Sequence, residues 1–382
     1  MTENKVIKPV GGGNLSNPDR YDSFDGLRAI AAFGIAIMHY LANIDKGVAE
    51  ILKEGSFLYG ALIPTLTTFV FMFFTLSAFS MCCGYFGRFQ MVSGSNGSKV
   101  SGFDTEKFYS KRYSRIWPFF ALLVMIDLVM NPSMEELYQC FADLTLAFNL
   151  LPNPEIHVIG VGWFLGVVFV FYMIFPWFVF LLQNKKRAWM AMAVALVMHY
   201  LCVYYFLTEE FVLPSEISNF RHNIVWSFPY FMVGGIMYLY RDWLREPKFK
   251  MLWLVLAVGS TVCQFAFNPK ILGDNYMYLL VVFCLWIMYA MTGGFAIGGV
   301  KLLDNKVMKF FGGLSMEIYL CHMVMFRVVE KLHLEKFIEN PHLLYWVWCV
   351  VGIAVAVVFS WVVKNWVFPF CYSKWCTRKQ LL

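Results

Sequence analysis

Residues 161–182 read VGWFLGVVFVFYMIFPWFVFLL, a run of 22 residues without a charged side chain. A helix of about 20 mostly apolar residues is long enough to cross the hydrocarbon core of a bilayer. The run therefore predicts a transmembrane helix. The composition of the whole chain agrees, because 59% of its 382 residues are hydrophobic and only 15% are charged.

Nine further apolar runs of similar length predict an all-α integral membrane protein with ten transmembrane helices. The ten predicted spans are 24–43, 57–82, 113–130, 161–182, 188–207, 224–240, 251–267, 276–297, 310–330 and 343–368. A shorter run at 137–151 ends before Pro152 and is interpreted as a re-entrant or interfacial segment. The composition excludes disordered proteins, nucleic-acid-binding tails and almost all soluble enzymes.

The loops between the predicted spans alternate in positive charge. If the N-terminus is cytoplasmic, the loops on that side carry 21 lysines and arginines, against 6 on the other side. Cytoplasmic loops are enriched in these residues, so both chain ends are predicted to be cytoplasmic. Residues 1–20 are predicted to be a flexible cytoplasmic tail, 21–370 the membrane domain and 371–382 a second cytoplasmic tail.

The ten cysteines do not suggest a metal site. Most lie inside apolar runs, and the chain contains no Cys-x-x-Cys pair. Structural zinc sites usually carry such closely spaced ligands. We therefore interpret the cysteines as small core side chains and expect no metal.

The first predicted span contains three ionisable residues, Asp25, Arg28 and His39. Arg28 and His39 are 11 positions apart, which places them on one helix face roughly 16 Å apart along the axis. Ionisable groups at membrane depth usually face a cavity or a partner. The alternative is an arginine that reaches the cytoplasmic interface and a histidine at the outer end of its helix.

The third predicted span begins with a cluster of basic residues that includes Arg112 and Arg115. These two are three positions apart, so they point the same way from the helix. Two neighbouring guanidinium groups repel each other unless an anion lies between them, and arginine binds phosphate well. The alternative is simple anchoring of a helix end on the cytoplasmic side.

Glu317 and His322 lie five residues apart in the ninth predicted span. This spacing turns them about 140° away from one another, so they can line one cavity without pairing directly. Asp127 and His199 are interpreted as buried and satisfied. Trp163 and Tyr172 are in the fourth span, where a tryptophan at the interface is common.

Five motifs occur in a fixed order along the chain. They are Phe24-Asp25-Gly26-Leu27-Arg28 with His39, Phe73-Phe74-Thr75-Leu76-Ser77-Ala78-Phe79, Phe108-Tyr109-Ser110-Lys111-Arg112-Tyr113-Ser114-Arg115-Ile116-Trp117-Pro118, Trp163-Phe164-Leu165 with Tyr172 and Pro176, and Ser315 with Ile318-Tyr319-Leu320 and His322. Together they resemble the membrane acyltransferase-3 family of bacterial carbohydrate O-acyltransferases, over nearly the whole chain.

Two sequence patterns of this family occur in the chain, and two positions differ from the residues that many relatives have. The Arg-x10-His pattern falls on Arg28 and His39, and Arg-x-x-Arg falls on Arg112 and Arg115. Ala78 stands where many relatives have glycine, and Val168 stands where many have glutamate. The Trp-Phe-Leu version looks like a subgroup that acts on exopolysaccharide or free sugars, and the chain looks like a stand-alone member.

The resemblance implies an acyl-CoA donor, with acetyl-CoA the default and succinyl-CoA open, and a hydroxyl of a cell-surface or exported carbohydrate as acceptor. Arg28, Arg112 and Arg115 would hold the donor phosphates. His39 would act as general base on the acceptor hydroxyl, or through an acyl-histidine intermediate. The residues expected to contact substrate are Asp25, Trp163, Tyr172, Glu317, Tyr319 and His322.

The resemblance also implies a multi-pass protein of the bacterial cytoplasmic (inner) membrane. Its expected partner is the lipid bilayer, and no nucleic-acid partner is expected. A homodimer is compatible with Gly293-Gly294 and Gly298-Gly299, which permit close helix packing within or between chains. The main alternative function is a polytopic transporter or flippase of glycan or lipid-linked sugar. A transacylase for amino sugars and a non-catalytic partner of a polysaccharide synthase also stay open.

Overall fold

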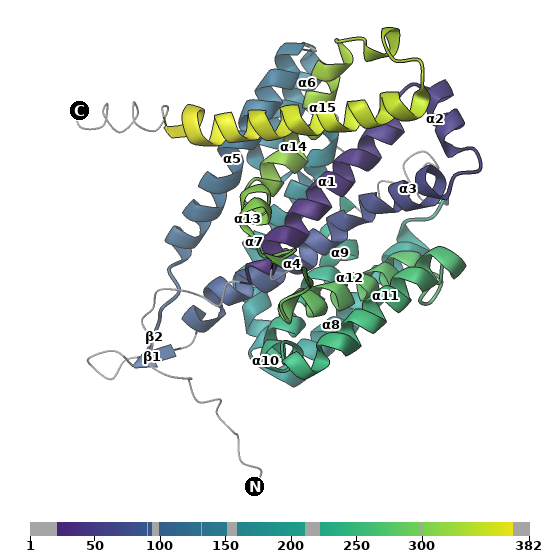
Figure 1. The fold of residues 1–382 in the computed structure, drawn as a ribbon. Helices are drawn as coiled ribbons and strands as arrows, with labels where there is room; N and C mark the ends of the chain where they lie inside the picture. The colour runs from purple at the N-terminus through teal and green to yellow at the C-terminus, as the bar shows by residue number, and fades with distance from the viewer. Residues whose placement is uncertain are drawn as a thin grey trace, which may run out of the picture.

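A computed structural model of the protein describes residues 21–89, 91–93, 99–130, 132–150, 159–210, 222–297 and 300–369. These residues form an all-helical bundle with two short hairpins (Figure 1). The helices are α1 (Ser23–Asn43), α2 (Lys46–Lys53), α3 (Ile63–Thr65), α4 (Phe69–Tyr85), α5 (Thr105–Met130), α6 (Met134–Thr145), α7 (Trp163–Leu182), α8 (Lys185–Leu201), α9 (Ile224–Leu239), α10 (Arg241–Leu244), α11 (Lys250–Phe267), α12 (Asn275–Met291), α13 (Lys306–Gly313), α14 (Ser315–Glu330) and α15 (Pro341–Val362).

The hairpins are antiparallel and contribute little to the bundle. One pairs β1 (Met91–Ser93) with β2 (Lys99–Ser101), and the other pairs β3 (Ala296–Ile297) with β4 (Val300–Lys301). In Figure 1 the first hairpin projects from one end of the bundle, while α15 (yellow) crosses its face. The fold class predicted from the sequence is therefore confirmed as all-α.

Within the described residues, seven helices are long and apolar enough to cross a membrane, or eight if α13 and α14 form one bent span. The other two predicted spans correspond to the shorter apolar helices α9 and α12. Each predicted span thus coincides with an apolar helix. The total of ten spans and the cytoplasmic position of the chain ends remain predictions.

Two predicted boundaries differ from the structure. Helix α12 ends at Met291 instead of continuing to residue 297, because Gly293 and Gly294 take positive φ angles of 99° and 60°. These glycines therefore form a turn and do not lie in a helix–helix contact, while Gly298-Gly299 lies outside the described residues. The predicted span 310–330 is also broken, because α13 and α14 meet at an angle of 64°.

The segment at 137–151 is too short to cross the membrane. Residues 137–145 belong to α6, a helix of 12 residues that ends where Leu146 adopts a left-handed conformation with φ 58°. A short 3₁₀ turn, Phe148–Leu150, follows. The re-entrant or interfacial position of the segment stays a prediction.

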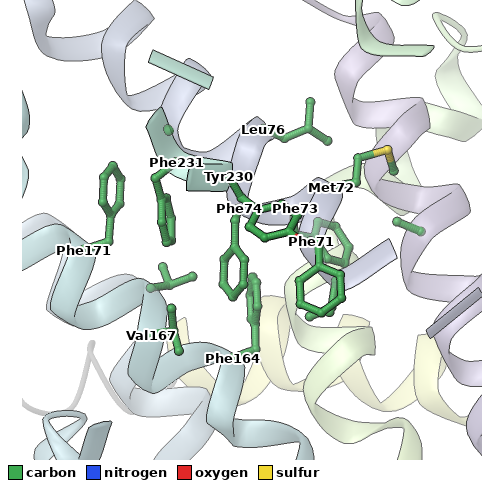
Figure 2. Close-up of a cluster of buried hydrophobic side chains, with 14 of the residues drawn as sticks. Phe71, Met72, Phe73, Phe74, Leu76, Phe164, Val167, Phe171, Tyr230 and Phe231 are labelled. Carbon is green, nitrogen blue, oxygen red and sulfur yellow. The ribbon is translucent and has the colours of Figure 1, made fainter. Parts of the chain in front are cut away.

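Aromatic side chains from α4, α7 and α9 fill the centre of the bundle (Figure 2). Phe74 stacks on Phe164 with ring centroids 5.0 Å apart, and Phe171 stacks on Phe231 at 4.0 Å. Gly234 lets α9 approach the backbone of α4, since a Cβ atom there would collide with the carbonyl oxygen of Thr75. By contrast, the apolar segments of α8 and α11 are only 17% buried, as expected for helices that face lipid.

Ion pairs and close backbone contacts fix the beginning of α1. Lys309 of α13 bonds both Asp22 (2.8 Å) and Asp304 (3.0 Å), and its ammonium group lowers the pKa of Asp304. Gly312 lies directly against the backbone of Asp25, where no side chain would fit. The first turn of α1 is therefore held against the junction between α13 and α14.

The two isolated polar groups expected to be satisfied are buried and paired. Asp127 of α5 accepts from Arg327 of α14 at 2.7 Å. His199 lies 2.8 Å from Asp274 and 2.7 Å from the carbonyl oxygen of Trp226. Both contacts join helices far apart in the sequence and so contribute to the fold.

Candidate functional site

Arg28 on α1 is held by two side chains. Its guanidinium group donates to the carboxylate of Asp25 at 3.1 Å and to the hydroxyl of Ser80 on α4 at 2.6 Å. The side chain of Arg28 retains 26% exposure, whereas that of Asp25 retains 9%. One turn of α1 thus positions both the charge and its counter-ion.

Arg112 on α5 is surrounded by aromatic rings. It donates to the hydroxyl of Tyr85 at 2.9 Å, and its guanidinium carbon lies 5.2 Å from the centroid of that ring and 5.7 Å from that of Tyr172. Its Nε atom is buried without a hydrogen-bond partner among the residues that the structure describes. Arg115, one turn further along α5, is exposed.

These side chains meet in one cavity of about 550 Å³, here called the basic cavity. Its ionisable and polar walls include Asp25, Arg28, Ser77, Ser80, Arg112, Arg115, Tyr172, Ser315 and Tyr319. Phe73 and Phe164, both visible in the aromatic core of Figure 2, form part of its apolar wall. The structure therefore brings Arg28, Arg112 and Arg115, the three arginines expected to hold the donor, into the wall of one cavity.

A second cavity, of about 250 Å³ and here called the histidine cavity, lies near the other end of α1. Its walls are formed by Ile35, His39, Thr67, Val70, Phe71, Gly160, Val161, Trp163, His222 and Tyr319. His222 stacks on Trp163 with ring centroids 4.1 Å apart and planes 14° apart. Among the described residues that line this cavity, none is a lysine, an arginine or a carboxylate.

Tyr319 on α14 lines both cavities. Its side chain is 3% exposed, and its hydroxyl donates to the carbonyl oxygen of Val161 at 2.9 Å. Because Arg28 and His39 lie on the same helix, α1 leads from the basic cavity to the histidine cavity. Tyr319 therefore stands between an arginine-lined site and a histidine-lined one.

His322 and Glu317 lie elsewhere. His322 is fully buried behind His39, with its ring centroid 5.2 Å from that of His39, and it lines neither cavity. Glu317 also lines neither cavity and forms an ion pair of 3.0 Å with Lys364. Of the residues expected to contact substrate, the cavity walls thus contain Asp25, Trp163, Tyr172 and Tyr319.

Three side chains of the site were not identified from the sequence. Ser80 and Tyr85 hold Arg28 and Arg112, which are both half-buried, and His222 lines the same cavity as His39. Ser80 and Tyr85 follow the second motif on the same helix, so a helical projection from Ser77 would have pointed to Ser80. His222 lies in a polar segment before α9, where no periodicity indicates which side chain turns inward.

Comparison with known proteins identifies the class. The family model described as "Acyltransferase domain" matches residues 21–364, which is nearly the whole chain. The chain therefore belongs to this acyltransferase family and, given its apolar helices, is a membrane acyltransferase. No curated protein and no solved structure matches it.

Proposed function

We propose that the protein transfers an acyl group, acetyl by default, from cytoplasmic acyl-CoA to a hydroxyl of a cell-surface or exported carbohydrate, in the bacterial cytoplasmic membrane. The observation that carries this proposal is the pair of unlike cavities that share Tyr319. A transferase needs one site for its donor and one for its acceptor, and the reacting atoms must meet between them.

The basic cavity suits the donor because CoA carries several phosphate charges. Among the described residues that line it, three are arginines and one, Asp25, is a carboxylate. Within the described part of the chain, the buried Nε–H group of Arg112 has no partner, and a phosphate oxygen would satisfy it by a charge-assisted hydrogen bond. The first turn of α14 also faces this cavity, and the N-terminal end of a helix favours negative charge.

The histidine cavity suits an uncharged sugar. Its polar and aromatic walls, including the stacked rings of Trp163 and His222, offer hydrogen bonds and flat surfaces without a lysine, arginine or carboxylate among the described residues. Such walls are typical of small-molecule sites, in which a few polar groups orient a ligand between apolar and aromatic surfaces. An acceptor hydroxyl placed there lies beside the half-buried ring of His39.

His39 then acts as a general base. It takes the proton of the acceptor hydroxyl while the oxygen attacks the carbonyl carbon of the thioester. As the tetrahedral intermediate collapses, the C–S bond breaks, and the CoA thiolate takes the proton from His39. The products are an ester and free CoA, and His39 returns to its neutral form.

The test is acetyl-CoA turnover by protein reconstituted in liposomes, measured as release of the CoA thiol with neutral mono- and disaccharides as acceptors. We expect His39→Ala to lower turnover at least about 100-fold, the usual contribution of a general base, while CoA binding persists. His333→Ala, at an exposed histidine paired with Glu335, is the matched control. Wild-type turnover by His39→Ala would exclude His39 as the base. Sugar movement across the bilayer without acetyl-CoA consumption would favour a transporter.

A further inference from the structure

The contacts of His322 indicate which of its two ring nitrogens carries the proton. Nδ1 of this ring lies 2.6 Å from the carbonyl oxygen of Tyr319. A carbonyl oxygen only accepts hydrogen bonds, so Nδ1 must carry the proton. In the neutral ring, Nε2 is then an unprotonated acceptor.

That acceptor has no partner within the described residues, although it is completely buried. A buried polar atom without a hydrogen bond is costly and calls for a physical explanation. The ionisable side chains around His322 are His39 and Tyr40 from α1 and Tyr319 from its own helix. Both tyrosine hydroxyls donate to backbone carbonyl oxygens, whereas the ring nitrogens of His39 form no hydrogen bond within the described residues.

The two histidine rings are suitably placed for a contact. Their centroids are 5.2 Å apart and their planes differ by 46°. His322 is enclosed on all sides, whereas His39 is half-buried and borders the histidine cavity. No hydrogen bond joins the two rings within the described residues, so the contact needs a rotation of the His39 ring.

We propose that His322 is a positioning residue for His39: its Nε2 accepts a hydrogen bond from an N–H group of His39. This inference rests on the proposed function. The contact fixes the tautomer of His39, so that the other nitrogen faces the cavity without a proton. When His39 takes up the hydroxyl proton, the imidazolium ion keeps its second N–H bonded to a neutral acceptor.

In serine proteases, an aspartate holds the catalytic histidine in this way and stabilises the charged ring. No carboxylate bonds to either histidine in the part of the chain that the structure describes. A neutral acceptor avoids the large cost of burying a carboxylate at membrane depth. His322 is fully buried and lines neither cavity, so a substrate in either cavity does not contact it directly.

Two amide substitutions separate the nitrogens of His322. His322→Asn retains an N–H group near the position of Nδ1 but loses the acceptor at Nε2. His322→Gln offers an amide oxygen near the position of Nε2 but loses the donor to Tyr319. We expect kcat with acetyl-CoA and neutral saccharides to fall about 10- to 100-fold in His322→Asn, as for other residues that orient a ligand or base.

The KM values for both substrates should stay unchanged in His322→Asn. The kcat of His322→Gln should be at least about tenfold higher than the kcat of His322→Asn. A purely structural role through the Tyr319 carbonyl predicts the reverse order, with His322→Asn the more active variant. That order, or wild-type kcat in both variants, would overturn the inference. If His39→Ala also kept full activity, the proposed function itself would fail.

A measurement on the unmodified protein covers the case in which the variants do not fold. Solid-state nitrogen NMR on histidine-labelled protein in lipid distinguishes protonated from unprotonated ring nitrogens, and the chain has only seven histidines. We expect His322 to be protonated at Nδ1, with Nε2 in through-space contact with an N–H of His39. A His322 ring protonated at Nε2 would contradict the proposal, whatever the acyl-transfer assay shows.

Discussion

The basic cavity and the histidine cavity lie near opposite ends of α1 and differ in the charge of their walls. The basic cavity is about 550 Å³ and contains Arg28, Arg112 and Arg115. The histidine cavity is about 250 Å³ and contains histidines, tryptophan and threonine, with no lysine, arginine or carboxylate among the described residues that line it. One helix therefore supplies an arginine to the basic cavity and a histidine to the histidine cavity.

This difference shows how a membrane protein can separate recognition from chemistry. Charged groups at membrane depth are costly, so the arginines lie where Asp25, Ser80 and Tyr85 bond them and where Arg115 remains exposed. The proposed base, in contrast, lies where no charge competes for its proton. The predictions that follow test whether each cavity has its own substrate and whether Tyr319 keeps the two apart.

The largest expected effect is on donor binding. Arg112→Ala removes a half-buried guanidinium group. A hydrogen bond to a charged group is worth about 1.5–3 kcal/mol, so we expect the KM for acetyl-CoA to rise about 10- to 100-fold. Arg115 is exposed, so Arg115→Ala should have a smaller effect. KM measurements at low and high salt test this, with Lys111→Ala, which does not line the cavity, as the matched control.

The KM for the saccharide should not change in either arginine variant. An acceptor KM that rises together with the donor KM would show that the two cavities do not have separate substrates. Unchanged acetyl-CoA affinity in both variants would contradict the phosphate-binding role of this arginine pair.

A smaller effect is expected at the aromatic wall of the histidine cavity. Trp163→Ala removes the ring on which His222 stacks, and we expect the KM for the saccharide to rise about tenfold while the KM for acetyl-CoA stays constant. Trp177→Ala is the matched control, because this tryptophan is on the same helix but is 54% exposed and lines neither cavity. If the KM for acetyl-CoA rose instead, Trp163 would contact the donor, and its proposed contact with the saccharide would be wrong.

The boundary between the cavities provides a third test. Tyr319→Phe keeps the ring but removes its hydrogen bond to the Val161 carbonyl. A lost hydrogen bond of about 1 kcal/mol corresponds to a factor of about five. We therefore expect acetyl-CoA hydrolysis without acceptor to rise about fivefold relative to transfer, as the freed ring admits water. An unchanged ratio of hydrolysis to transfer would show that this contact does not keep the cavities apart.

The sequence predicted the features that depend on local periodicity. Each apolar run of the sequence coincides with an apolar helix of the structure. The helical repeat also predicted that Arg28 and His39 share one helix, and each of them lines a cavity. It could not predict contacts set by packing between distant segments. Glu317 pairs with Lys364 instead of facing a cavity, and His222 turns inward onto Trp163 from a loop.

The smallest expected effect lies outside both cavities and concerns stability alone. Burial, with a contribution from the negative charge of Asp127, raises the pKa of Asp143 on α6 from 3.8 to about 7. The folded protein therefore binds this proton more tightly than the unfolded chain does, so stability falls as the pH rises between these two values and is constant above them.

Asp143→Asn cannot ionise, so its Tm should lack this decrease and exceed that of the wild type by about 2–4 °C at pH 8. Thermal unfolding of both proteins between pH 5 and pH 8 measures the difference, with the exposed Glu135→Gln on the same helix as control. Transfer activity should be equal in all three proteins, because Asp143 lines neither cavity. An Asn variant with the wild-type pH slope would show that the stability change has another origin.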